Sequence, residues 1–266
     1  ATPVKMVWQS WGHSGRPAPG EYDASRPDPS RHYNVARVVS WLDRHLKGKR
    51  VDTGPRFAYF RDWVRYSDIA TPAYATSDHF PVGTPHTWRL SGSGDLVTGV
   101  ARPGRQAFLA TPLPTSTSPT DAFGLQPFAE PRDLPGSFAS WATPRLSRKV
   151  DVVGSPRLTL RVQAPAAAAT QALGPAGQLV LSVKITDVAP GGKASLIHDL
   201  EAPIRIPDVR RAVTIRLPAI VHRFARGHRI RLVVSAPSEN YRGGLSVTPV
   251  TVISGARQRL TLPVVR

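Results

Sequence analysis

The sequence predicts a mainly β protein, a two-sheet β-sandwich preceded by a short segment with one strand and one helix. After Gly48, apolar residues recur at every second position with polar residues between them, as in residues 158–162 and 260–264. This is the pattern of half-buried antiparallel strands. Before Gly48 the clearest pattern has helical spacing instead. About eight strands of the alternating kind are enough for two packed sheets.

The first apolar run, residues 4–10, predicts a strand that leads into a tight loop at residues 12–15. Residues 16–31 are rich in Pro, Gly and Asp, which is the composition of a loop. This first strand has no visible partner. It pairs either with later strands of the chain or with a sheet whose other strands lie outside this sequence.

One amphipathic helix is predicted over residues 33–47. Asn34 is placed to cap its first turn, and Gly48 follows as a C-terminal stop. The spacing of its apolar residues lines one face of the helix. These residues are Val35, Val38, Val39, Leu42 and Leu46.

Two long segments separate the predicted strands of the sandwich. Residues 92–144 are rich in Pro, Ser, Thr and Gly but contain several aromatic residues, so we expect an ordered excursion that packs on the sandwich or a neighbouring domain. Residues 164–177, rich in Ala with two prolines, are expected to form a flexible loop. The predicted strands are residues 57–60, 86–90, 157–163, 178–188, 212–217, 228–235, 250–254 and 259–265.

The chain is strongly basic, with 35 Lys and Arg against 18 Asp and Glu and a formal net charge of +17. Such a balance raises polyanion binding as a hypothesis. The basic residues are spread over the whole chain without long runs, and many stand singly on predicted strands, such as Arg161, Arg216 and Arg231. We interpret them as a solvated surface and expect no nucleic-acid partner. No apolar run approaches the roughly 20 residues of a membrane span, so we expect no membrane partner.

The chain contains no cysteine, which excludes disulfides, thiolate zinc sites and a cysteine nucleophile. His198, His222 and His228 lack the spacing of a metal site, so we expect neither a metal nor a cofactor. The absence of cysteine is compatible with export and with the cytosol. We favour an extracytoplasmic location.

No complete catalytic constellation is present, because the Gly-x-Ser-x-Gly elbow that presents a serine nucleophile does not occur. His13 is the one catalytic candidate. A histidine in a short loop directly after an apolar strand stands where an α/β-hydrolase places its general base. A lone loop histidine is otherwise an ordinary surface residue.

Several motifs, in the same order along the chain, resemble the CocE/NonD family, which includes cocaine esterase-type acyl esterases and X-Pro dipeptidyl-peptidases. Residues 11–14 (Trp-Gly-His-Ser) are similar to the segment that carries the family's catalytic histidine, and residues 41–48 to the helix end that follows it. Residues 55–63 resemble the strand that leads out of the hydrolase domain. Residues 179–192 and 226–235 resemble two strands of the family's C-terminal jelly roll.

The resemblance implies the C-terminal part of a Ser-His-Asp hydrolase that cleaves ester or amide bonds, X-Pro dipeptidyl bonds among them. His13 matches the histidine that deprotonates the serine and later protonates the leaving group. Residues 1–53 would be the remnant of the α/β-hydrolase domain, and residues 54–266 a jelly-roll β-sandwich that shapes the active site. The serine, the triad aspartate and the oxyanion-hole donors would precede residue 1, so this chain should be inactive alone.

The implied partners are the N-terminal α/β-hydrolase portion, in cis or as an associated chain, and a small ester or peptide substrate. Whether the protein forms a homo-oligomer stays open. The alternative function is a free-standing β-sandwich binding module, for carbohydrate or another ligand, without catalysis. In that case Trp63, Trp88 and Trp141 would supply a stacking platform.

Overall fold

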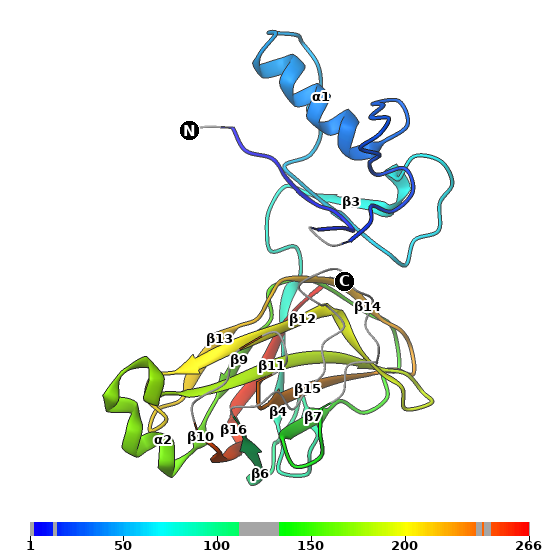
Figure 1. Ribbon diagram of the computed structural model, residues 1–266. Helices are drawn as coiled ribbons and strands as arrows, with labels where there is room; N and C mark the ends of the chain where they lie inside the picture. Colours follow the sequence, from blue (N-terminus) through cyan, green and yellow to red (C-terminus); the bar gives the residue numbers. More distant parts are fainter. Residues whose placement is uncertain (1–2, 13–14, 112–132, 238–240, 242–245, 266) are drawn as a thin grey trace. The chain divides into compact units, whose positions relative to one another are not determined.

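The structure, a computed structural model, describes residues 3–12, 15–111, 133–237, 241 and 246–265. The chain divides into two compact units, Ala1–Val82 and Gly83–Arg266. It is mainly β, as predicted from the sequence (Figure 1). Among the described residues, no helix has both the length and the apolar character needed to cross a bilayer.

The first unit contains a three-stranded sheet and one α-helix. Strand β1 (Met6–Trp8) runs parallel to β2 (Phe57–Phe60), and β3 (Tyr74–Ser77) pairs antiparallel with the other edge of β2. Parallel pairing needs a long crossover, and helix α1 (Tyr33–His45) lies within it. A short 3-10 turn, Thr71–Ala73, leads into β3. The early strand, the helix and the 57–60 strand thus occur where the sequence predicts them.

Three details of the first unit differ from the expectations. Residues 54–82, assigned above to the sandwich, lie in this unit, because β2 and β3 pair with β1. The helix begins one residue after His32, so Asn34 is not its cap but lies inside its first turn. Of the predicted apolar face only Val35 is buried, while Val38, Val39, Leu42 and Leu46 are exposed.

Gly20 holds a crowded turn of the first unit. Its φ is +73°, and its carbonyl oxygen accepts hydrogen bonds from the backbone N–H groups of Tyr33 and Ala70. A Cβ atom at this position would overlap the carbonyl oxygen of Asp68. Gly48 also has a positive φ, +64°, but no atom lies within 4 Å of its Cβ position.

We expect Gly20→Ala to lower the free energy of unfolding by about 2–4 kcal/mol. The backbone strain of a positive φ and the steric overlap of the new Cβ atom both destabilise the fold. Gly48→Ala is the matched control, with backbone strain alone and an expected loss of about 1 kcal/mol. Urea unfolding of both variants measures the difference. Equal losses would contradict the role of close packing at Gly20.

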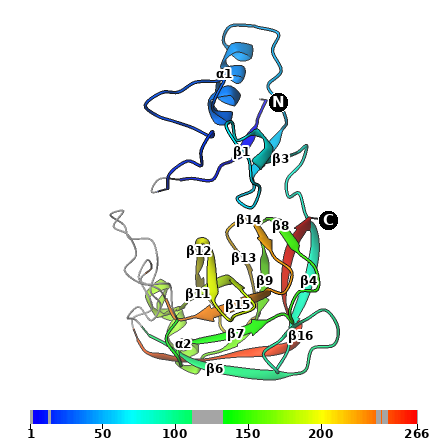
Figure 2. The same cartoon turned by 90° about the vertical axis from the view of Figure 1, so that its right-hand side faces the viewer.

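The second unit is a sandwich of two antiparallel sheets (Figures 1 and 2). The smaller sheet has the order β12-β11-β15-β7, and the larger has β13-β9-β16-β4-β5 along its main path, with four more strands attached to β16 and β8. The smaller sheet consists of β7 (Phe138–Ala142), β11 (Leu179–Val188), β12 (Ala194–Ile206) and β15 (Arg229–Ser235). The larger sheet consists of β4 (Thr84–Leu90), β5 (Leu96–Val97), β6 (Gly104–Ala110), β8 (Val150–Gly154), β9 (Arg157–Leu160), β10 (Val162–Gln163), β13 (Val213–Arg216), β14 (Ile220–Phe224) and β16 (Thr248–Val265).

Strand β16 organises the larger sheet. Its first half pairs with β6 and β10, and its second half with β4, β8 and β9. The pairing with β4 shifts register between Gly255 and Arg259, and Gly255 has a φ of +142°. The two strands predicted at 250–254 and 259–265 are therefore one strand with an irregularity, which bends a sheet locally.

The core lies between the two sheets, and the alternating residues that predicted the strands fill it. Trp141 on β7 is 1% exposed. Its indole N–H donates to the carbonyl oxygen of Ser91 (3.0 Å), after β4, and to Oγ of Ser254 (3.2 Å) on β16. Trp141 therefore connects the smaller sheet to the larger one.

The segments without clear alternation contain further ordered structure. Residues 164–177, expected to be a flexible loop, form helix α2 (Pro165–Thr170) and the 3-10 turns Gln171–Leu173 and Pro175–Gly177. Gln171 is buried, and its side-chain oxygen accepts a hydrogen bond from the backbone N–H of Val209. The expected excursion at 92–144 supplies β5, β6 and β7, while residues 112–132 lie outside the described part.

Candidate functional site

His13, the catalytic candidate, lies outside the described residues, and so does Ser14. Both flanks of its loop are described. The loop leaves the C-terminal end of β1 through Ser10, and it returns through Ala18 to the turn at Gly20. Trp11 and Tyr22, one on each flank, stack with ring centroids 5.4 Å apart.

A fully buried carboxylate, Glu21, joins the two flanks. Its Oε1 accepts a hydrogen bond from the backbone N–H of Ser10 (3.1 Å), and its Oε2 accepts one from the backbone N–H of Ala18 (2.9 Å). The hydroxyls of Ser10 and Tyr74 also donate to this carboxylate. Within the described part of the chain, no Lys, Arg or His forms an ion pair with Glu21. Buried carboxylates need such complete sets of donors.

Tyr74 extends this network to β3 and α1. Its ring stacks on Tyr33 with centroids 3.8 Å apart, and its hydroxyl also lies 3.1 Å from the side-chain oxygen of Asn34. Burial raises the pKa of the Tyr74 hydroxyl well above its ordinary value, and the hydrogen bond to Glu21 raises it further. The raised pKa keeps the Tyr74 hydroxyl protonated, as a donor, at neutral pH. Glu21 was not predicted from the sequence, because a single acidic residue in a Pro- and Gly-rich stretch is typical of an exposed loop.

A second cluster lies on the sandwich, where one carboxylate bridges two histidines. Asp187, at the end of β11, lies 3.0 Å from Nε2 of His222 on β14 and 2.8 Å from Nδ1 of His228, just before β15. The ring of His198 contacts that of His222 edge to face. Among the described residues no three His, Asp or Glu are placed to hold a metal ion. His228, held by Asp187, directly precedes strand β15.

The Asp187 cluster predicts an acid-sensitive contribution to stability. Burial alone raises the pKa of Asp187, but the hydrogen bonds from His222 and His228 outweigh it, so the pKa lies below its ordinary value. A lowered pKa in the folded state stabilises the fold above the ordinary pKa of about 3.9, and this contribution is lost as the pH falls through the lowered value.

We expect Asp187→Asn to cost about 1–2 kcal/mol at pH 5. The difference from wild type should shrink between about pH 4 and pH 2. Urea unfolding midpoints of the two proteins across this range measure it. A difference that stays constant with pH would contradict the assignment.

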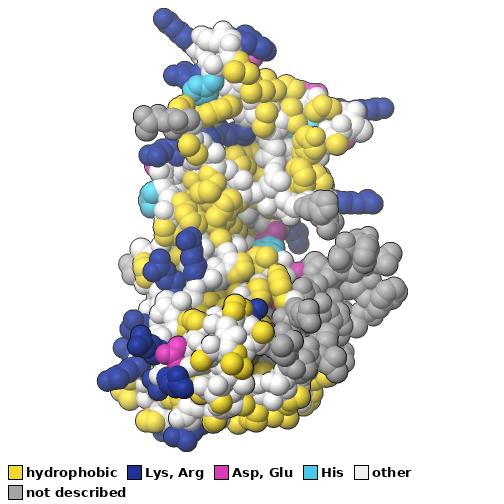
Figure 3. Space-filling view, turned by 60° about the vertical axis from the view of Figure 1, so that its left-hand side comes forward, with side chains coloured by type: hydrophobic (Ala, Val, Ile, Leu, Met, Phe, Trp, Pro, Cys, Tyr) yellow, Lys and Arg dark blue, Asp and Glu magenta, His cyan; other side chains and the backbone are white. Residues whose placement is uncertain are grey.

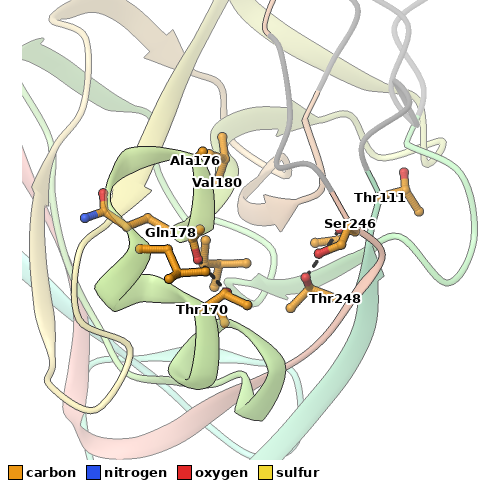
Figure 4. A pocket seen from close by; sticks show the side chains of 12 residues that line it. Thr111, Thr170, Ala176, Gln178, Val180, Ser246 and Thr248 are labelled. Atoms are coloured by element: carbon orange, nitrogen blue, oxygen red, sulfur yellow. Dashed lines mark hydrogen bonds between the residues drawn. The ribbon is translucent and has the colours of Figure 1, made fainter.

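The sandwich also contains a pocket of about 220 Å³ between α2, the start of β11 and the start of β16 (Figure 4). Among the described residues, its lining consists of small, apolar and hydroxyl-bearing side chains and Gln178, with no titratable residue. The hydroxyl of Thr170 donates to the carbonyl oxygen of Gly177 (2.7 Å).

The tryptophans do not form the stacking platform that a free-standing binding module would need. Trp88 and Trp141 are buried in the sandwich core, 7% and 1% exposed, and Trp63 belongs to the first unit. An exposed aromatic row of these residues is thereby excluded.

Residues 63–244, more than half of the chain, match the family model of the X-Pro dipeptidyl-peptidase C-terminal non-catalytic domain. The chain belongs to this family. Membership in the X-Pro dipeptidyl-peptidase C-terminal family confirms the resemblance found in the sequence motifs, and it agrees with the observed β-sandwich. The family domain is described as non-catalytic.

Solved structures of hydrolases share this fold with the family member described here. An aminopeptidase from a marine sediment archaeon (Thaumarchaeota archaeon) superposes with a TM-score of 0.69 at 16% identity, over 99% of this chain and 49% of its own. An α-amino acid ester hydrolase gives 0.64 at 14% identity, over 86% and 44%. A CocE/NonD family hydrolase from Staphylococcus aureus gives 0.59 at 13% identity, over 88% and 46%. No curated protein matches the chain in sequence.

The chain thus spans about half the length of these solved relatives. At these identities the likeness shows the fold alone. The chain carries a hydrolase-associated domain, and the catalytic role of His13 remains a prediction.

Proposed function

We propose that the chain is part of a serine hydrolase that cleaves ester or amide bonds, in which His13 is the general base. In this proposal an α/β-hydrolase portion, in cis or as an associated chain, supplies the serine, the aspartate and the oxyanion hole. His13 takes the proton from the serine hydroxyl as the serine attacks the carbonyl carbon, and later gives it to the leaving group.

The observation that carries the proposal is the Glu21 network around the His13 loop. A general base must be held within about 3 Å of its nucleophile, so its loop needs fixed ends. Glu21 binds the backbone N–H groups of Ser10 and Ala18, one on each side of that loop. The two flanks of the loop are therefore held together by one carboxylate, as a positioned base requires.

The position of the loop in the first unit supports the same proposal. Strand β1 is parallel to β2, and the loop follows its C-terminal end. Active sites of α/β proteins form at the carboxyl ends of parallel strands. In the described structure β1 pairs on one side only, and α1 exposes Val38, Leu42 and Leu46. This free edge and apolar face fit a larger sheet and its covering helices, as the α/β-hydrolase portion would provide.

The substrate class follows from the proposed triad, which acts on acyl compounds. We propose a small ester or peptide, with X-Pro dipeptides as one subclass, and a sandwich that limits access to the serine.

Native material tests the proposal by intact mass, N-terminal sequencing, and hydrolysis of p-nitrophenyl butyrate and Ala-Pro-p-nitroanilide on one sample. We expect a polypeptide with a Gly-x-Ser-x-Gly elbow, joined to or copurified with this chain, and loss of activity in His13→Ala. The faster substrate identifies the subclass. A folded chain without such a partner that is inert to both substrates would refute the proposal.

A further inference from the structure

Arginines and threonines form a regular array on the outer face of the larger sheet. Across the neighbouring strands β13, β9, β16 and β4, the inward residues Ile215, Leu158, Leu260 and Trp88 align and are buried. Residues on either side of them along each strand therefore point outward. They form two rows: Thr214, Thr159, Arg259 and Arg89, and beside it Arg216, Arg157, Thr261 and Thr87.

Like charges stand directly opposite each other in both rows. Arg216 pairs in register with Arg157, and Arg259 with Arg89. Such pairs destabilise a sheet. None of these four strands contains Asp or Glu. Within the described part of the chain, Arg157, Arg216 and Arg259 form no ion pair, and all three are exposed.

The basic face continues along the first half of β16. Arg105 on β6 is in register with Ile253, whose backbone N–H donates to the carbonyl oxygen of Arg161. The two exposed arginines border a shallow hollow that also includes Gln163 and Ser254. In the face of the sandwich that Figure 3 presents, several dark-blue basic side chains gather on one side, with an acidic side chain among them.

Hydroxyl groups occupy the positions between the arginines. Thr87 and Thr261 lie 2.9 Å apart through their Oγ1 atoms, and Thr159 and Thr214 3.4 Å apart. Neighbouring strands are about 4.8 Å apart, so the array spreads its cations over roughly 14 Å. Guanidinium groups bind carboxylate and sulfate with paired hydrogen bonds, and threonine hydroxyls can bond to sugar hydroxyls.

We propose that this face, which we call the arginine-threonine face, binds a linear acidic polysaccharide. The proposal goes beyond the hydrolase function and involves none of its residues. The two rows contain no aromatic ring on which nucleic-acid bases could stack and no apolar side chain that could enter a bilayer. The face cannot be located in the sequence, because its arginines are single residues on strands far apart along the chain.

Heparin affinity at 150 mM salt tests the proposal, with the variant Arg157→Gln/Arg216→Gln/Arg259→Gln. The matched control is Arg148→Gln/Lys149→Gln/Arg226→Gln, which removes the same charge from exposed sandwich residues outside the face. We expect the face variant to bind heparin at least about tenfold more weakly than wild type. The slope of log affinity against log salt concentration should decrease by the equivalent of about three ionic contacts. The control should bind within about twofold of wild type, and neutral dextran should not bind.

Thermal unfolding of the face variant checks its fold, and removal of opposed like charges should leave Tm unchanged or raise it. Equal loss in both triple variants would show an effect of net charge alone and overturn the proposal. The same holds if wild type does not bind heparin at 150 mM salt. Tighter binding to duplex DNA or to anionic phospholipid vesicles than to heparin, lost in the face variant, would also overturn the assignment to a polysaccharide.

Discussion

Glu21→Ala is expected to lower the free energy of unfolding of the first unit by about 3–5 kcal/mol. The substitution removes the acceptor of the partly buried backbone N–H groups of Ser10 and Ala18 and of the buried Tyr74 hydroxyl. Hydrogen bonds to a charged group contribute about 1.5–3 kcal/mol each, but bonds to one carboxylate are not additive. Amide hydrogen exchange of residues 15–82 measures the loss.

Two further variants separate the carboxylate from its neighbours. Tyr74→Phe removes one donor and should cost about 1 kcal/mol. Glu21→Gln keeps the shape, but its amide nitrogen cannot accept, so we expect an intermediate loss. In the intact hydrolase proposed above, Glu21→Gln should lower kcat about tenfold or more with little change in KM, because the base is displaced. Unchanged exchange in Glu21→Ala would refute the structural role, and an unchanged kcat would refute the link to His13.

Trp141→Ala is expected to lower the free energy of unfolding of the sandwich by about 3–5 kcal/mol. The ring is almost completely buried between the sheets, and its loss leaves a cavity that β7 and β16 cannot fill. The carbonyl oxygen of Ser91 would also lose its indole donor. Urea unfolding monitored by circular dichroism measures the effect.

Trp141→Phe is the control, since it keeps most of the ring but removes the N–H group. We expect it to lose about half as much stability as Trp141→Ala. A loss below about 1 kcal/mol in Trp141→Ala would show that the contact between the sheets does not depend on this residue.

The strands that the sequence predicted are those in which one face is buried and the other solvated, such as β9 with Leu158 and Leu160 inward. Strand β12 was not predicted because its apolar and polar residues do not alternate. In the structure His198 and Asp199 have positive φ values, which interrupt the regular strand. Helix α2 was missed because its alanines and Pro165 give no amphipathic pattern, while its order depends on contacts such as Gln171 with Val209.

The candidate site was predictable only in part. The position of His13 after an apolar strand and its match to a family motif are visible in the sequence. The Glu21 network is not, because it joins Ser10, Ala18 and Tyr74 through the crossover and the sheet. The arginine-threonine face depends on strand order in the same way, since Arg89 and Arg259 become neighbours only when β4 pairs with β16.

The pairing of β16 also sets the order in which the sandwich can assemble during synthesis. Its partners β4, β6, β8, β9 and β10 all precede it in the chain. A ribosome therefore releases five strands before the strand that joins them, and contacts over such long sequence separations form slowly. Until residues 248–265 emerge, the earlier strands expose unpaired edges, so the nascent chain should depend on chaperones more than its folded form suggests.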